Sequence, residues 1–236
     1  MPQTPIATLA ELWSYPVKGM RGQPVASLAL DAYGIAGERR FAIQSSGAPH
    51  GKPMLSGAER AAMLLFAAES QGDEVLVITP SGQRFRIDDP ALLRAMQQAL
   101  PGGHVLSLVR SAKPLNDVRP VALLGTATPA QLTIERTLPV DARRFRANLL
   151  LAMRDNSGFA EDRLVGATLR IGREAELRIT ERIPRCRIVT LDPDTAAPDP
   201  SLMKHLDRQH DGCVGIYATV VHPGVLHVGD SITLIE

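Results

Sequence analysis

One segment decides how the fold and chemistry of this chain are interpreted: Arg182-Ile-Pro-Arg-Cys-Arg-Ile-Val-Thr-Leu-Asp-Pro-Asp-Thr195. Cys186 lies there between Arg185 and Arg187, and a short apolar run then leads to the turn-forming residues 192–194. Nearby positive charge favours a thiolate, which is both a nucleophile and a soft metal ligand. Cys186 is therefore the first candidate for chemistry. The alternative is that it is a small buried hydrophobe at the end of a strand, as lone cysteines often are.

Length and charge limit the classes of function. The chain has 236 residues, enough for one large or two small domains. Lysine and arginine number 26 and aspartate and glutamate 25, so the formal net charge is +1. This balance gives no reason to expect nucleic acid or an anionic membrane as a partner. Any anion-binding site must therefore be local.

Cysteine content and hydropathy indicate the compartment. The two cysteines, Cys186 and Cys213, match neither a metal finger nor a disulfide framework, which suits a reducing cytosol. Residues 1–11 lack the basic and apolar regions of a signal peptide. No apolar run approaches the ~18 residues of a membrane helix. We expect a soluble, cytoplasmic protein without a membrane partner.

Short strands are predicted along most of the chain, with few helices. Helix 88–100 is indicated by an aspartate before a first-turn proline and by a Pro-Gly-Gly stop, and helices are also expected from Thr128 and over 199–209. Alternating or short apolar runs predict strands at 6–17, 24–30, 39–44, 74–79, 83–87, 104–110, 148–153, 168–171, 175–179, 215–221 and 228–235.

This pattern predicts an α+β fold that is predominantly β, with barrel architecture and peripheral helices. We place a domain boundary near residue 110, at the start of a polar stretch. Residues 1–110 are expected to form a small β-barrel-like domain. Residues 111–236 are expected to form a second β-barrel.

Three further segments carry residues suited to an anionic ligand. Lys18 and Gly19 lie in a basic loop, Arg40 begins a predicted strand, and Arg146 and Asn148 form an Arg-x-Asn pair. Lysine supplies charge, arginine supplies bidentate donors, and asparagine supplies a neutral amide. Each of these residues alone is weak evidence, because a surface lysine in a loop, for example, is usually just solvated.

Five segments follow one another in a fixed order along nearly the whole chain. They are Tyr15-Pro-Val-Lys18, Gly37-Glu-Arg-Arg-Phe41, Asp141-Ala-Arg-Arg-Phe-Arg-Ala-Asn148, Arg185-Cys186 with Asp192-Pro-Asp-Thr195, and Pro223-Gly-x-x-x-x-Gly-Asp230. Together they resemble the MOSC superfamily with its N-terminal β-barrel domain. Among its members the chain looks most like the mitochondrial amidoxime reducing components and bacterial reductases of N-hydroxylated compounds.

The resemblance implies a molybdenum cofactor, molybdenum bound to molybdopterin, in a cleft shared by the two domains. By position, Cys186 would be the catalytic residue and the protein ligand to the metal. The other residues implied to bind the cofactor are Lys18, Gly19, Arg40, Arg146, Asn148 and Arg185. A soft thiolate for a transition metal and dispersed cations for a phosphorylated cofactor agree with the chemistry of these side chains.

The implied function is an oxidoreductase that reduces N-hydroxylated or N-oxide small molecules. The chain carries no cysteine-rich ferredoxin segment, so a separate electron-transfer protein would have to supply electrons. Two alternatives stay open. One is a non-catalytic cofactor carrier or sulfur-transfer module, and the other is a structural β domain without a cofactor.

Some positions depart from the family pattern. Gly19 stands where relatives often have a serine, and Pro184 stands where a small polar residue or cysteine is common. Cys213 opens a predicted apolar strand and is expected to pack in the core. His205 and His210 are five residues apart, and His210 with Cys213 supplies only half of a zinc site, so no zinc site is expected.

Overall fold

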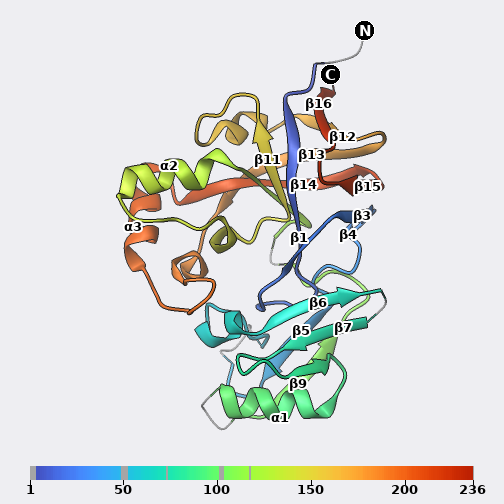
Figure 1. Cartoon of the computed structure of the whole chain (residues 1–236), viewed down its shortest axis with the longest axis vertical. Coiled ribbons are helices and arrows are strands. Elements are labelled where there is room, and N and C mark those ends of the chain that lie inside the picture. The colour runs from blue at the N-terminus through green and yellow to red at the C-terminus, as the bar shows by residue number, and fades with distance from the viewer. Residues whose placement is uncertain (1–3, 49–52, 73, 101–103, 117, 236) are drawn as a thin grey trace.

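The structure is a computed structural model that describes residues 4–48, 53–72, 74–100, 104–116 and 118–235. It has a larger barrel with two helices on one side and a smaller β-rich unit at one end (Figure 1). The barrel strands are β1 (Ala7–Ser14), β10 (Val121–Gly125), β11 (Leu149–Met153), β12 (Thr168–Ile171), β13 (Ala175–Pro184), β14 (Cys213–His222) and β16 (Ser231–Ile235).

Within the described residues these seven strands close into a ring. Their order is β11-β10-β14-β13-β12-β16-β1, and β1 also pairs with β11. Strands β10 and β11 are parallel, whereas the other neighbours are antiparallel. Closure leaves the ring without an open edge, which is the usual way for a sheet to avoid unpaired backbone groups.

A bulge in β1 keeps its apolar side chains inside the barrel. The register with β11 shifts between Leu9 and Glu11, so that Leu9 pairs with Leu151 and Leu12 pairs with Leu149. Without the extra residue, strict alternation would turn Leu12 to the opposite face from Leu9. Both leucines are instead buried in the barrel core.

The first strand of the chain therefore belongs to the barrel that the second half of the chain mostly builds. Strand β1 hydrogen bonds with β11 and β16, and β3 (Ser27–Asp31) pairs with β15 (Gly224–His227). The domain boundary near residue 110 stays a prediction. In three dimensions residues 7–35 share one hydrophobic core with residues 121–232.

The smaller unit packs around a second hydrophobic core, which contains Val17, Phe41, Phe66 and Leu92. The remaining strands of the chain are β2 (Gln23–Val25), β4 (Gly34–Ile35), β5 (Phe41–Ser45), β6 (Ala67–Gln71), β7 (Glu74–Ile78), β8 (Arg84–Arg86) and β9 (Leu106–Arg110). In the smaller unit β5 pairs with β9, and β6, β7 and β8 form a meander.

Three α-helices lie within the described ranges, and the predicted helix 88–100 is confirmed as α1. Asp89 caps it by accepting a hydrogen bond from the Ala91 amide at 2.8 Å, with proline at the first position. None of the helices in the described residues is long and apolar enough to cross a membrane. The helices are α1 (Pro90–Ala99), α2 (Ala127–Arg136) and α3 (Pro200–Gln209), with 3₁₀ turns η1 (Ala61–Leu65), η2 (Ala142–Phe145), η3 (Ala160–Leu164) and η4 (Arg187–Thr190).

The predominantly β fold of the sequence analysis is confirmed. The strands predicted at 74–79 and 83–87 form the antiparallel pair β7–β8, and those predicted at 168–171 and 175–179 form the antiparallel pair β12–β13. The last strand begins later than expected, at Ser231 instead of Val228, because residues 224–227 form the separate strand β15. That short strand leaves the barrel to pair with β3, while β16 returns to pair with β12 and β1.

Candidate functional site

Cys186 lies where β13 ends and η4 begins. Strand β13 stops at Pro184, and Cys186 is the extended residue that precedes the first residue of η4. The residue is exposed. The alternative that Cys186 is a buried hydrophobe is therefore wrong, and its thiol can be reached by a ligand.

The turn after η4 is clamped to η2 by ion pairs. The Arg143 guanidinium lies 2.6 Å from an Asp194 carboxylate oxygen, and the Arg144 guanidinium lies 3.3 Å from that of Asp192. Hydrogen bonding to Arg143 lowers the pKa of Asp194. Arg144 also donates to the Thr190 carbonyl at 2.9 Å. These contacts fix the segment that carries Cys186, and they give the predicted turn 192–194 a structural role.

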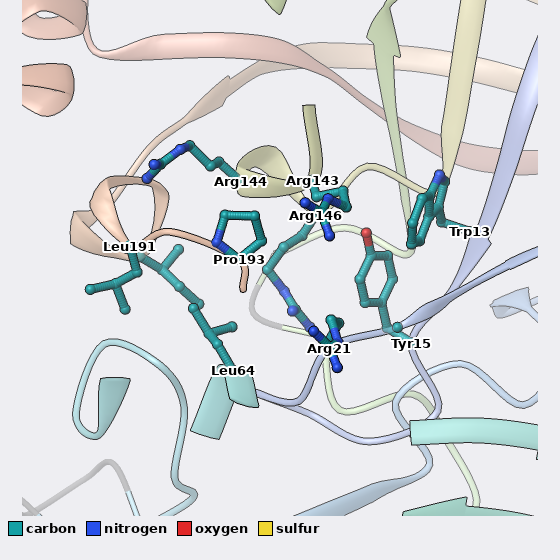
Figure 2. Close-up of a pocket in the computed structure, with 11 residues that line it drawn as sticks. Trp13, Tyr15, Arg21, Leu64, Arg143, Arg144, Arg146, Leu191 and Pro193 are labelled. Carbon is teal, nitrogen blue, oxygen red and sulfur yellow. The ribbon is translucent and has the colours of Figure 1, made fainter. Parts of the chain in front are cut away.

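A pocket opens between the end of β1, η2 and η4 (Figure 2). In this view Trp13 and Tyr15 lie on one side and Leu64 and Leu191 on the other, with Pro193 between them. Four arginines from two separate segments line it. Part of their charge is compensated within the protein, because Arg143 pairs with Asp194 and Arg144 pairs with Asp192. The lining residues are Trp13, Tyr15, Arg21, Gly22, Leu64, Arg143, Arg144, Arg146, Ile188, Leu191 and Pro193.

Cys186 is two residues before Ile188, which lines the pocket. The thiol-bearing segment and the arginine-lined pocket are thus parts of one region. Of the predicted cofactor-binding residues, Arg146 is the one that lines the pocket itself. The sequence analysis missed Arg21, Arg143 and Arg144, although the last two lie in a segment that it quoted.

Tyr15 positions cations beside this pocket. The Arg146 guanidinium carbon lies 4.4 Å from the centre of the Tyr15 ring, and that of Arg39 lies 5.3 Å from it. Such contacts are favourable because the face of an aromatic ring is electron-rich. Burial raises the pKa of Tyr15 to about 12, so the ring stays a neutral phenol at physiological pH. Arg146 and Arg39 both have left-handed backbone conformations, with φ of 52° and 44°, which non-glycine residues seldom adopt.

A buried carboxylate organises the residues beneath the pocket. Glu38 has 0% exposure. It accepts hydrogen bonds from the Tyr15 amide at 2.9 Å and the Asn148 side-chain amide at 3.0 Å. Its charge is compensated by the Arg39 guanidinium at 2.5 Å. The Glu38 side chain therefore joins three segments. They are the loop between β4 and β5, the end of β1 and the start of β11.

Asn148 has a structural position in this geometry. Its side chain is buried, and its amide nitrogen donates to Glu38 and to the Trp13 carbonyl at 3.2 Å. Its amide oxygen accepts from the Ala122 backbone at 3.2 Å. Both ends of the amide are thus committed to the protein. Here Asn148 joins β1, β10 and β11, and its hydrogen bond to Trp13 holds a residue that lines the pocket.

Arg185 also faces the protein. Its guanidinium donates to the Val214 carbonyl at 2.8 and 2.5 Å and to the Phe145 carbonyl at 2.9 Å. Burial lowers the pKa of Arg185 to about 10, which still leaves it charged at neutral pH. The residue before Cys186 therefore places a fixed cation under the thiol segment and ties β13 to η2.

Lys18 and Arg40 contact residues 111–115, in the polar stretch that links the two units. The Lys18 ammonium donates to the Leu115 carbonyl at 3.0 Å, and the Arg40 Nε donates to the Ser111 carbonyl at 2.6 Å. Neither side chain is among those that line the pocket. In this arrangement both hold the polar stretch that links the units, and their predicted contact with a cofactor stays a prediction.

Gly19 is explained by backbone geometry. Its φ is +82°, and a Cβ atom there would lie 2.8 Å from the Leu55 carbonyl oxygen. Glycine adopts this conformation without a steric cost, whereas a side chain would force the Leu55 segment to move. The absence of the family's serine at this position follows from the close approach of the two loops.

Cys213 differs from its expected place in the core, and Trp13 lies at the wall of the pocket. Cys213 begins β14 as expected, but it is only half-buried, and its thiol donates to the Asp211 carbonyl at 3.4 Å. Trp13 is half-buried at the pocket wall, and its indole donates to Glu11 at 2.8 Å.

Comparison with known protein families gives two matches in chain order. The family model described as the MOSC N-terminal beta barrel domain matches residues 6–100. The model described as the MOSC domain matches residues 115–233. A search of curated proteins finds no significant match to this chain.

Several solved structures are similar to the chain at low identity. The YuaD protein of Bacillus subtilis is 13% identical, over 97% of this chain and 94% of that one, with a TM-score of 0.49. YiiM of Escherichia coli is 12% identical, over 98% of this chain and 71% of that one, with a TM-score of 0.45. YiiM of Geobacillus stearothermophilus is 20% identical, over 50% and 54%, with a TM-score of 0.39.

The buried Glu38 gives a stability prediction. Glu38→Ala should lower the free energy of unfolding by about 3 kcal/mol or more, because Arg39 and two buried amides lose their acceptor. Glu69→Ala is the matched control, since Glu69 pairs with Arg84 at 3.0 Å with both side chains partly exposed. That change should cost about 0–1 kcal/mol. Urea unfolding measures both, and equal effects would contradict the role of Glu38.

Proposed function

Because the chain belongs to the MOSC domain family with its N-terminal β-barrel domain, we propose that it is a molybdenum-cofactor-dependent reductase of N-hydroxylated or N-oxide small molecules. MOSC domains bind the molybdopterin form of the molybdenum cofactor. The observation that carries the proposal is the exposed Cys186 next to a pocket lined by four arginines.

The side chains of the site fit such a cofactor. A thiolate is a strong donor to a transition-metal centre, and Cys186 is exposed on an anchored segment. The phosphate of molybdopterin is an anion, and arginine side chains bind phosphate through charge and paired donors. Arg146 and Arg21 would hold this anion, with Trp13 and Tyr15 offering flat surfaces for the pterin ring.

The protein's contribution is orientation and electrostatics. The clamp of Arg143 on Asp194 holds the Cys186 segment in place, and the buried Arg185 adds a fixed positive charge beneath it. When bound, the cofactor supplies the two-electron chemistry that removes oxygen from the substrate. A neutral Tyr15 and the apolar Leu64, Ile188 and Leu191 border the pocket and limit access of water.

A separate electron-transfer protein is part of the proposal. Reduction of an N–OH group to N–H consumes two electrons and two protons and releases water. The two cysteines of the chain cannot hold an iron–sulfur cluster, which takes four ligands. The electrons would therefore be delivered to the bound cofactor by another protein.

Metal loading tests the role of Cys186. Protein produced in a molybdenum-replete host should contain near-stoichiometric molybdenum, and Cys186→Ser should contain little, because serine offers a harder and far less acidic oxygen. Cys213→Ser is the matched control and should load like the wild type. Elemental analysis measures all three, and equal molybdenum in wild type and Cys186→Ser would remove the ligand assignment.

Cofactor retention tests the arginine pocket. Arg146→Gly removes the guanidinium but accepts the left-handed backbone, so it avoids a separate strain effect. Loss of a charge-assisted hydrogen bond costs about 1.5–3 kcal/mol, so retention of the pterin should weaken roughly tenfold or more. Arg173→Ala, on the exposed turn between β12 and β13, should retain the cofactor fully. Quantifying the released pterin by fluorescence compares the two variants.

Turnover separates a reductase from a carrier. Dye-reduced holoprotein should consume an amidoxime such as benzamidoxime, and Cys186→Ala should abolish this activity. A carrier would instead transfer its cofactor to an apo-enzyme without reducing any compound of a broad N-hydroxylated panel. That second result would replace the reductase proposal with the carrier.

A further inference from the structure

We infer that Glu135, His205 and His210 form a second metal site, one that binds a divalent transition metal of the zinc class between α2 and α3. The Oε2 atom of Glu135 lies 2.8 Å from Nε2 of His205 and 2.7 Å from Nε2 of His210. The three potential ligand atoms all lie within 4.8 Å of one another. Two imidazoles and one carboxylate thus converge on one point.

The three residues lie on two helices that pack side by side on the barrel and on the residue that ends the second helix (Figure 1). Glu135 is in the last turn of α2, His205 is in α3, and His210 follows the last residue of α3. A metal bound to all three would cross-link the helices. The separation of 70 residues between Glu135 and His205 explains why the histidine spacing alone predicted no zinc site.

Groups behind the ligands hold them in place. Gln131 donates to the other oxygen of Glu135, Oε1, at 2.9 Å. The Phe159 ring stacks on His210 with centroids 4.0 Å apart and an interplanar angle of 16°. Metal-binding side chains usually have such outer partners, which fix their orientation. Here two of the three ligands are supported in this way.

The chemistry of the ligands selects the metal. Imidazole nitrogen with a single carboxylate suits zinc and its first-row neighbours, whereas magnesium and calcium prefer oxygen ligands alone. Three protein ligands leave a fourth tetrahedral position for water.

Solvent can reach the cluster, because the three side chains are between 14% and 23% exposed. Zinc–ligand distances are about 2.0–2.2 Å. A metal would therefore sit between atoms that are now in hydrogen-bond contact, with a small outward movement of the rings. The site shares no residue with the arginine-lined pocket.

Metal binding to the full-length protein tests the inference. After chelator treatment and removal of the chelator, the Cys186→Ser protein should bind about one zinc ion per chain in equilibrium dialysis. This background removes the exposed thiol as a competing ligand. His205→Ala and His210→Ala added to it should each weaken zinc binding by roughly tenfold or more. His222→Ala, an exposed histidine at the end of β14, is the matched control and should bind like the background.

Two further readouts separate a metal site from a simple hydrogen-bonded cluster. Zinc should raise the melting temperature of the background protein but not of the histidine variants, because it binds only the folded arrangement. Gln131→Ala, which leaves all ligands in place, should weaken zinc binding by ~10-fold. If a histidine variant fails to fold by circular dichroism, Glu135→Gln takes its place with the same expectation.

Three results of the zinc-binding measurements would contradict the inferred metal site. Zinc affinity that is the same in the background protein and in the folded ligand variants would place the metal elsewhere. Absence of zinc uptake by both the wild type and the Cys186→Ser background would mean that the three residues form only a hydrogen-bonded cluster. Zinc uptake by the wild type but not by the background would assign the metal to the thiol. None of these outcomes depends on the molybdenum cofactor or on reductase activity.

Discussion

The burial of the Glu38 carboxylate is the constraint on which the site depends. An ionised carboxylate removed from water is costly unless it gains charge compensation and hydrogen bonds. Glu38 obtains both, from the Arg39 guanidinium and from the amides of Tyr15 and Asn148. These partners come from three separate parts of the chain, so they can be satisfied together only when β1 and β11 are in register. The same contacts place Tyr15, and with it Arg146, at the pocket.

The basic residues of the site divide into two groups according to what their side chains contact. Arg185 and Arg144 direct their donors to backbone carbonyls, and therefore hold η2 and η4 together. Arg21 and Arg146 line the pocket and come from distant parts of the sequence. Arg21 follows β1, and Arg146 lies at the end of η2. Arginines from segments distant in sequence thus meet at one place in a nearly neutral chain.

Local features of the fold could be predicted from the sequence, and distant pairings could not. The alternation in residues 6–17 and the Asp89-Pro90 start of α1 depend on neighbouring residues, and both are present in the structure. Closure of the barrel by β1 depends on pairing with residues 149–153, which no local pattern encodes. For the site, local charge identified Cys186. Arg21 was not predicted because the other arginines of the pocket lie more than a hundred residues away in sequence.

The two proposed ligand sites are connected through α3. Its residues Leu202 and Leu206 share a hydrophobic core with Val189 of η4, and the Asp199 amide at its start donates to the Thr190 carbonyl at 2.7 Å. The Arg136 guanidinium, at the end of α2, lies 2.5 Å from Asp199. Helix α3 is therefore the outer wall against which the Cys186 segment rests. A metal that joined α2 to α3 would hold that wall in place, and would stabilise the position of Cys186 without contacting it.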